Sequence, residues 1–212
     1  MTPDSTENMK SFSQNRPLQG MVAWLVIFWI AMAIDPIYRE DWIMENILVV
    51  CFSLILLLTH SRFIFSNQSY LLLTLFMTLH LVGAHYTYAE TPFGFWMQSW
   101  FGFERNHFDR LVHYAFGMLL ALPVRELMLR AAQMKPSWTN TVTIMLILSM
   151  SGLFEVFEML AAVLVYPELG DAYLGTQGDV WDAQQDMLQA TIGAMTALHL
   201  YKMSGKHRSD RV

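Results

Sequence analysis

The sequence predicts an all-α membrane protein, a bundle of six transmembrane helices with both termini in the cytoplasm. Of its 212 residues, 54% are hydrophobic and 15% are charged, whereas a soluble domain carries about 25% charged residues. The apolar residues also occur in long runs, and six helices of ~20 residues each would use almost the whole chain. The composition therefore leaves no room for a separate soluble domain.

Six apolar segments are the expected helices. They cover residues 20–34, 42–58, 70–88, 108–124, 141–165 and 180–201. The last begins with several acids, but its second half is apolar and a basic tail follows. The first 17 residues are polar and lack the apolar core of a signal peptide. We therefore expect a polar cytoplasmic tail over residues 1–18, a transmembrane domain over 19–202 and a basic cytoplasmic tail over 203–212.

The basic residues indicate how the bundle is oriented. With six spans, ten of the thirteen Lys and Arg residues fall on the side of the termini, and only Arg39, Arg105 and Arg110 fall on the other. Cytoplasmic loops carry the excess of Lys and Arg. The termini are therefore expected in the cytoplasm, and the aromatic loop over residues 90–107 is expected in the opposite membrane interface, where Trp and Phe settle.

Acids and histidines gather in the outer half of four expected helices. Asp109 and His113 are four residues apart, and Glu155 and Glu158 three apart, so each pair shares one face of its helix. The last helix presents a stripe that steps by three, four and three residues and that Gly193 continues. This stripe consists of Asp179, Asp182, Asp186 and Gln189.

Two histidines of the third helix cannot both point at one centre. His80 and His85 are five residues apart, which is about 140° around a regular helix. We favour His85, because it is close to the outer end and the helix can unwind near Pro92.

A bound divalent metal ion is the simplest explanation of so many intramembrane acids. Each charge there is costly unless it faces protein, water or a partner, and only Arg105 and Arg110 are available as cations. Carboxylates with one or two imidazoles suit Zn, Mn, Fe or Mg. The expected metal ligands are His85, His113, Glu155, Glu158, Asp182 and Asp186, and the expected catalytic residues are Asp109, His113 and Glu158.

Plainer interpretations stand beside this one. His113 suits a hydrogen-bonded packing residue, and Asp109 with Arg110 suits an interfacial helix start. Asp179 suits a helix cap. The single cysteine, Cys51, excludes internal disulfides and cysteine-based metal sites, and is expected to be a small buried apolar residue.

Longer motifs resemble a known family. They are HYTYAE at 85–90, RNHFDRLVH at 105–113, RE at 125–126, EVFE at 155–158 and LGTQGDVWDAQQDM at 174–187. In order and over about residues 20–200, they resemble the YjdF family of bacterial inner-membrane proteins. This implies a multi-pass inner-membrane location but no reaction. Met159 departs from the pattern, which has an aromatic residue there. A shorter pattern resembles VanZ-like membrane proteins of the cell envelope, and it contains Asp109, Arg110, His113, Gly117, Glu155, Asp182, Asp186 and Gly193.

Three functions fit these features. The first is a metal-dependent enzyme of the outer leaflet that acts on a lipid-linked or cell-envelope substrate, with a carboxylate or histidine as general base. The second is a small cation- or proton-coupled transporter, since intramembrane acids often mark ion routes. The third is a non-catalytic subunit whose acids bind a basic loop of a partner. Membrane lipids are the expected partners and nucleic acid is not.

Overall fold

The computed structural model describes residues 11–164 and 176–205, and the regular secondary structure in this part of the chain is all helical. The expected tails at residues 1–10 and 206–212, and the loop over 165–175, lie outside the described residues. The elements are η2 (Phe12–Gln14), α1 (Arg16–Met32), α2 (Arg39–Thr59), α3 (Asn67–Tyr86), α4 (Pro92–Phe101), α5 (Phe108–Arg130), α6 (Pro136–Leu164) and α8 (Asp182–Met203).

Each of the six expected apolar segments forms a helix, with somewhat different ends. Asn15 caps α1 by accepting a hydrogen bond from the backbone N–H of Leu18 (3.2 Å), and Ser66 caps α3 in the same way through Ser69 (3.2 Å), as side-chain oxygens do at helix starts. α5 contains Pro123 and continues past its expected end at residue 124 to Arg130.

Four helices are long and apolar enough to cross a membrane, namely α2, α3, α5 and α6, and α1 is apolar but shorter. The all-α membrane class is therefore confirmed. The outer faces of these helices are apolar: Leu57, Leu58 and Leu164 are each more than 70% exposed in the isolated chain. Such a surface suits contact with lipid rather than water. Cys51 belongs to this outer face, so the expectation that it is buried was wrong.

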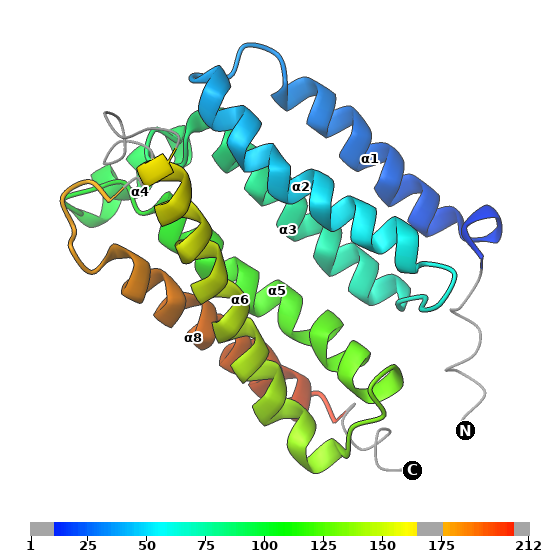
Figure 1. Cartoon of the computed structure of the whole chain (residues 1–212). Helices are drawn as coiled ribbons and strands as arrows, with labels where there is room; N and C mark the ends of the chain where they lie inside the picture. The colour runs from blue at the N-terminus through cyan, green and yellow to red at the C-terminus, as the bar shows by residue number, and fades with distance from the viewer. Residues whose placement is uncertain (1–10, 165–175, 206–212) are drawn as a thin grey trace.

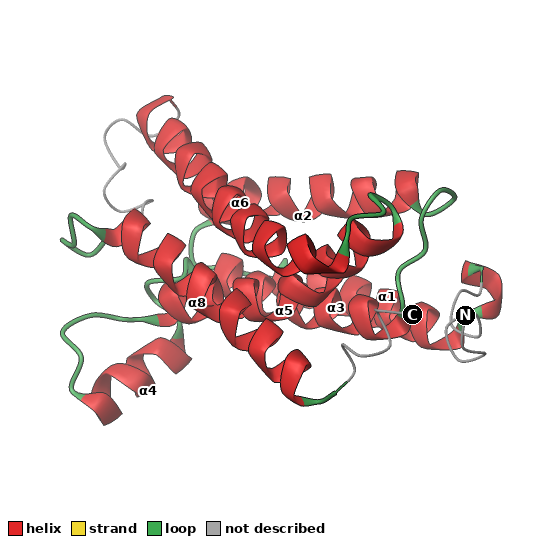
Figure 2. Ribbon diagram, turned by 90° about the horizontal axis from the view of Figure 1, so that it is seen from below, coloured by secondary structure: helices red, strands yellow, loops and turns green. Residues whose placement is uncertain are grey.

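The described helices form two groups that meet at the centre of the bundle. α1 and α2 pack against α3, whereas α6 and α8 pack against α5. α3 and α5 pack against each other and join the groups (Figures 1 and 2). The buried apolar residues that α3, α5 and α8 contribute form one continuous core.

The closest helix contact is between α5 and α8, and two glycines make it possible. A Cβ atom on Gly117 would overlap with the carbonyl oxygen of Ala190 and lie 2.8 Å from the amide nitrogen of Ala194. A Cβ atom on Gly193 would lie 2.8 Å from the amide nitrogen of Met118. Small residues allow membrane helices to approach this closely. The contact fixes the start of α5 beside the start of α8.

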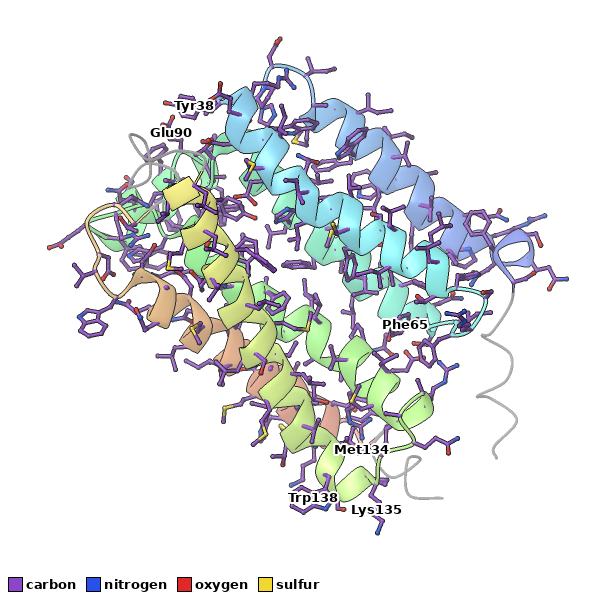
Figure 3. The ribbon with its side chains drawn as sticks, viewed as in Figure 1. Tyr38, Phe65, Glu90, Met134, Lys135 and Trp138 are labelled. Atoms are coloured by element: carbon purple, nitrogen blue, oxygen red, sulfur yellow. The ribbon has the colours of Figure 1, made fainter. Side chains whose placement is uncertain are left out.

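The two ends of the bundle differ in their polar contacts. At one end, the hydroxyl of Tyr38 donates a hydrogen bond to Glu90 (3.3 Å), and the negative charge of Glu90 raises the pKa of that phenol. Met134 and Lys135 lie at the opposite end (Figure 3). There Glu126 of α5 accepts hydrogen bonds from the backbone N–H (2.9 Å) and hydroxyl (2.8 Å) of Ser66 at the start of α3.

The aromatic segment expected to be an interfacial loop contains a short helix, α4, so this expectation was wrong in its local structure. Pro92 occupies its first turn, and Gly102 ends it with a left-handed backbone (φ 67°), which glycine adopts at little cost. The side chains of Trp100 and Phe101 remain 70% and 64% exposed. The aromatic side chains that predicted a position in the membrane interface therefore remain exposed on the surface of α4.

Candidate metal centre

Helices α5 and α8 bring three potential metal ligands together. Asp109 and His113 lie in the first two turns of α5, and Asp186 lies in the second turn of α8. One ligand atom from each of these residues lies within 4.8 Å of the others. His113 is 7% exposed and Asp186 only 1%. The sequence placed all three residues in the expected site, and the α5–α8 contact explains why they meet.

The imidazole of His113 is held from one side and faces carboxylates on the other. Its Nδ1 atom lies 3.3 Å from the hydroxyl of Ser151 on α6. Its Nε2 atom lies 3.6 Å from Asp109 Oδ1 and 3.5 Å from Glu155 Oε1. Metal-binding histidines are usually oriented in this way, with one ring nitrogen hydrogen-bonded and the other free for the ion.

The distances between these atoms suit a shared cation better than direct hydrogen bonds. A hydrogen bond between nitrogen and oxygen has a length of about 2.7–3.2 Å. Two ligands of a tetrahedral ion, each bound at about 2.1 Å, lie about 3.4 Å apart. The 3.5 and 3.6 Å separations around Nε2 of His113 are close to that value. The arrangement can therefore accept an ion with small side-chain movements.

Two buried carboxylate oxygens in this region have no hydrogen-bond partner among the described residues. They are Oδ1 of Asp186 and Oε1 of Glu155. A buried acceptor that makes no hydrogen bond is costly, and in lipid no bulk water is available to supply one. A cation, a proton or an ordered water molecule is needed at both atoms.

Asp182, another expected metal ligand, has two arginine partners instead. Its Oδ1 atom accepts hydrogen bonds from Arg105 (2.5 Å) and Arg110 (3.2 Å). Arg110 also binds Asp179 (2.5 Å) and Gln185. The backbone N–H of Trp181 donates to Asp179 (2.9 Å), and this bond and Arg110 lower the pKa of Asp179. The acids in and just before α8 thus form two groups. Asp179 and Asp182 pair with arginines, whereas Asp186 faces His113.

Backbone contacts fix the loop that carries Arg105 and precedes α5. Arg105 donates to the carbonyl of Thr176 (2.8 Å). The side-chain amide of Gln177 accepts from the backbone N–H of Asn106 and donates to its carbonyl, both at 3.0 Å. Asn106 is 1% exposed and its side chain accepts from the backbone N–H of Phe108 at the start of α5 (3.0 Å). The segment before α5 and the segment before α8 therefore form one rigid cover over the site.

Glu158 lies one turn beyond Glu155 on α6, on the same side of the helix. Both glutamates line a cleft of about 950 Å³ together with Asp179 and Asp182. Glu155 lies 3.5 Å from Nε2 of His113, and Glu158 is its neighbour on the same face of α6. Glu158 is thus close to the centre, but outside the compact group that Asp109, His113 and Asp186 form.

The structure places His85 away from this group. Its Nδ1 atom donates to the carbonyl of Met32 at the end of α1 (3.0 Å). His80 instead lines, with Asp109 and His113, a cavity of about 110 Å³. The two histidines do point in different directions, as their spacing predicts, but the preference for His85 was wrong: His80 is the one that faces the centre.

Glu45 is a buried polar residue that the sequence reasoning missed. It is 8% exposed, and its Oε2 atom lies 3.9 Å from Nε2 of His80. His80 donates to the Glu45 carbonyl (3.2 Å), so the other ring nitrogen of a neutral imidazole accepts from the hydroxyl of Tyr88 (2.5 Å). An acid four residues after Asp41 and inside an apolar run was the available signal.

The described residues thus define an α-helical integral membrane protein with a buried carboxylate and histidine centre at one end of its bundle. The chain belongs to the family described as "Predicted membrane protein (DUF2238)", whose model matches residues 17–207. It is 36% identical over 175 residues to "Inner membrane protein YjdF" of Escherichia coli (strain K12), which covers 82% of this chain and 83% of that protein. This confirms the family resemblance found in the motifs. No solved structure matches the chain.

Proposed function

We propose that this protein is a metal-dependent membrane enzyme that binds a divalent ion through Asp109, His113 and Asp186, with Glu155 as a further ligand. The observation that carries the proposal is the meeting of these groups from three helices, with ligand atoms of the first three within 4.8 Å. The buried oxygens of Asp186 and Glu155, which have no hydrogen-bond partner among the described residues, support it. Zn, Mn or Fe suits this mixture of imidazole and carboxylates best, and Mg suits the carboxylates alone.

The arrangement supports hydrolysis or group transfer. A divalent ion held there by Asp109, His113, Asp186 and Glu155 would supply Lewis-acid chemistry and a water nucleophile near neutral pH. Glu158, on the same face of α6 as Glu155, is the proposed general base. Asp182 is assigned a supporting role, because it holds Arg105 and Arg110 (2.5 and 3.2 Å).

We also propose that the chain spans the inner membrane six times, with both termini in the cytoplasm and the centre in the outer leaflet. The relative from Escherichia coli carries the description of an inner membrane protein, and ten of thirteen basic residues lie on the side of the termini. In this topology α1 is the first span and α8 the sixth, in addition to the four helices that are long and apolar enough to cross a membrane. The centre then lies at the depth of lipid head groups, which favours a lipid-linked or cell-envelope substrate.

Elemental analysis of the purified protein tests the metal. We expect about one equivalent of ion per chain in the wild type and in Asp179→Asn, a matched carboxylate change outside the centre. Asp186→Asn and Asp109→Asn should lose most of it. A folded wild-type protein without metal, after growth and purification in metal-replete buffers, would rule out a metal-dependent enzyme.

Reporter fusions test the topology separately. A fluorescent protein fused after Asp210 should fluoresce, because it folds in the cytoplasm, and alkaline phosphatase at the same position should be inactive. The opposite pattern would place the C-terminus, and with it the centre, on the other side from the one proposed.

A further inference from the structure

An apolar cavity begins at the candidate metal centre and extends between four helices. Its volume is about 110 Å³, and a cavity of comparable size, about 150 Å³, in a soluble protein stays dry and takes up benzene. Its walls are apolar side chains from α2, α3, α5 and α6: Leu48, Phe52, Phe76, Met77, Val112, Phe116, Leu120, Met150 and Phe154. Ordered water has almost no partners on such walls.

Residues with polar side chains line one end of the cavity, although most of its surface is apolar. They are His80, Tyr88, Asp109, His113 and Ser151. The same Asp109 and His113 belong to the candidate metal centre. The cavity and the centre therefore share two residues, so a molecule with its apolar part in the cavity would present its polar end to the ion.

Tyr88 is held at this polar end by the backbone as well as by His80. Its φ angle is 40°, and that of Thr87 is 52°, in the left-handed region that non-glycine residues rarely adopt. The backbone N–H of Tyr88 donates to the carbonyl of Gly83 (2.9 Å). A Cβ atom on Gly83 would lie 2.5 Å from the Tyr88 ring. An uncommon backbone conformation and a glycine thus place this side chain where the cavity meets the centre.

The cavity has walls from two helices that do not pack closely together. Leu48 and Phe52 belong to α2, and Met150 and Phe154 belong to α6. Among the described residues, the main neighbour of α2 is α3, and those of α6 are α5 and α8. The two ribbons diverge in Figure 1, and Met150 is 40% exposed. A ligand dissolved in the bilayer can therefore enter from the side, between α2 and α6.

We propose that this cavity holds the few carbon atoms next to the head group of a membrane lipid substrate, whose chain continues into the bilayer between α2 and α6 and whose head group lies between Tyr88 and the candidate metal centre. The chain-site proposal rests on the proposed function for the role of the metal centre, but the hydrocarbon chain can bind without the ion. Because lipid tails are as apolar as the walls, preference for this site comes from close packing and from the polar end, not from the hydrophobic effect.

Photolabelling tests the chain site directly. The probe is a hexadecanol whose chain carries a diazirine, added to vesicles of phosphatidylethanolamine and phosphatidylglycerol that contain the purified protein. We expect saturable labelling of cavity residues, Phe52, Phe116 and Phe154, in addition to non-saturable labelling of the outer faces. Leu48→Trp, which fills the cavity, should lower the saturable labelling at least fivefold.

Leu57→Trp is the matched control, because it makes the same change on the outer face of the same helix, where Leu57 is 72% exposed. It should label like the wild type. If Leu48→Trp does not fold, Met150→Trp on the α6 wall replaces it, with the same expected loss. Labelling confined to the outer faces, or saturable labelling that neither filled variant lowers, would overturn the proposal.

Metal content measured on the same samples separates the two proposals. Saturable labelling of a protein that never contains metal would support the chain site and contradict the proposed metal-dependent function. Stoichiometric metal without saturable labelling would leave the metal centre standing and overturn the chain site.

Discussion

Gly117 of α5 packs directly against the backbone carbonyl of Ala190 on α8, with no space for a side chain between them. Ala190 and Ala194 are fully buried in this contact. The contact lies two turns from Asp109 along α5 and one turn from Asp186 along α8, so it sets how close these two acids come. The small residues of the membrane interior therefore build the candidate metal centre, although none of them carries its chemistry.

Replacing Gly117 by leucine should separate α5 from α8. Overpacking of a well-packed core costs about 1–3 kcal/mol, so the thermal unfolding midpoint in detergent should fall, and the bound metal should be lost with it. Gly20→Leu is the matched control, since a Cβ atom there meets nothing within 4 Å. An unchanged midpoint and full metal content in Gly117→Leu would show that the helices are not held this closely.

Arg105→Gln should destabilise the cover over the site without removing the metal. Arg105 binds Asp182 (2.5 Å), whose side chain is only 7% exposed, and hydrogen bonds to charged groups contribute about 1.5–3 kcal/mol. Urea or thermal unfolding should report a loss of that size, whereas the exposed Lys135→Gln should be neutral. Loss of metal from a folded Arg105→Gln protein would contradict the division of the α8 acids into paired and ion-facing groups.

Glu126→Gln should weaken the end of the bundle far from the centre. Glu126 accepts hydrogen bonds from the hydroxyls of Ser66 (2.8 Å) and Ser69 (2.5 Å) and pairs with Arg130. A neutral amide cannot accept all of these, so we expect about 1.5–3 kcal/mol lower stability with metal content unchanged. Glu104→Gln, an exposed change near the other end, serves as the control. Equal stability of the two variants would show that the contacts of Glu126 do not stabilise this end of the bundle.

Asp179→Asn should change the acid dependence of stability. The N–H of Trp181 and the guanidinium of Arg110 lower the pKa of Asp179 in the folded protein. The charged carboxylate therefore stabilises the fold fully above its unfolded pKa of about 3.9, and this contribution is lost as the pH falls through the lower folded value. At pH 7 the variant should unfold at a lower temperature than the wild type, and this difference should shrink as the pH falls below 4. A gap that stays constant between pH 7 and pH 3 would exclude this linkage.

Local periodicity determined a large part of this structure. Runs of apolar residues predicted all six of the long helices, because a helix in lipid must satisfy its backbone internally wherever the run is long enough. The four-residue spacing of Asp109 and His113 predicted that they share a face, and the 3.6-residue period makes this independent of the surroundings. The same reasoning correctly predicted that His80 and His85 point in different directions, because the angle between two side chains around one helix is a local property.

Tertiary packing decided which of these residues meet. Nothing local to α3 says whether His80 or His85 faces α5, because the rotation of a helix about its axis is set by its neighbours. Asp182 and Asp186 share one stripe of α8, yet Asp182 pairs with Arg105 and Asp186 faces His113. Their partners come from a loop and a helix more than 70 residues earlier in the chain. The sequence alone thus determines that acids and histidines lie in the membrane. Their division into arginine pairs and a candidate metal centre is decided by the tertiary structure, because Gly117 and Gly193 allow α5 and α8 to approach closely.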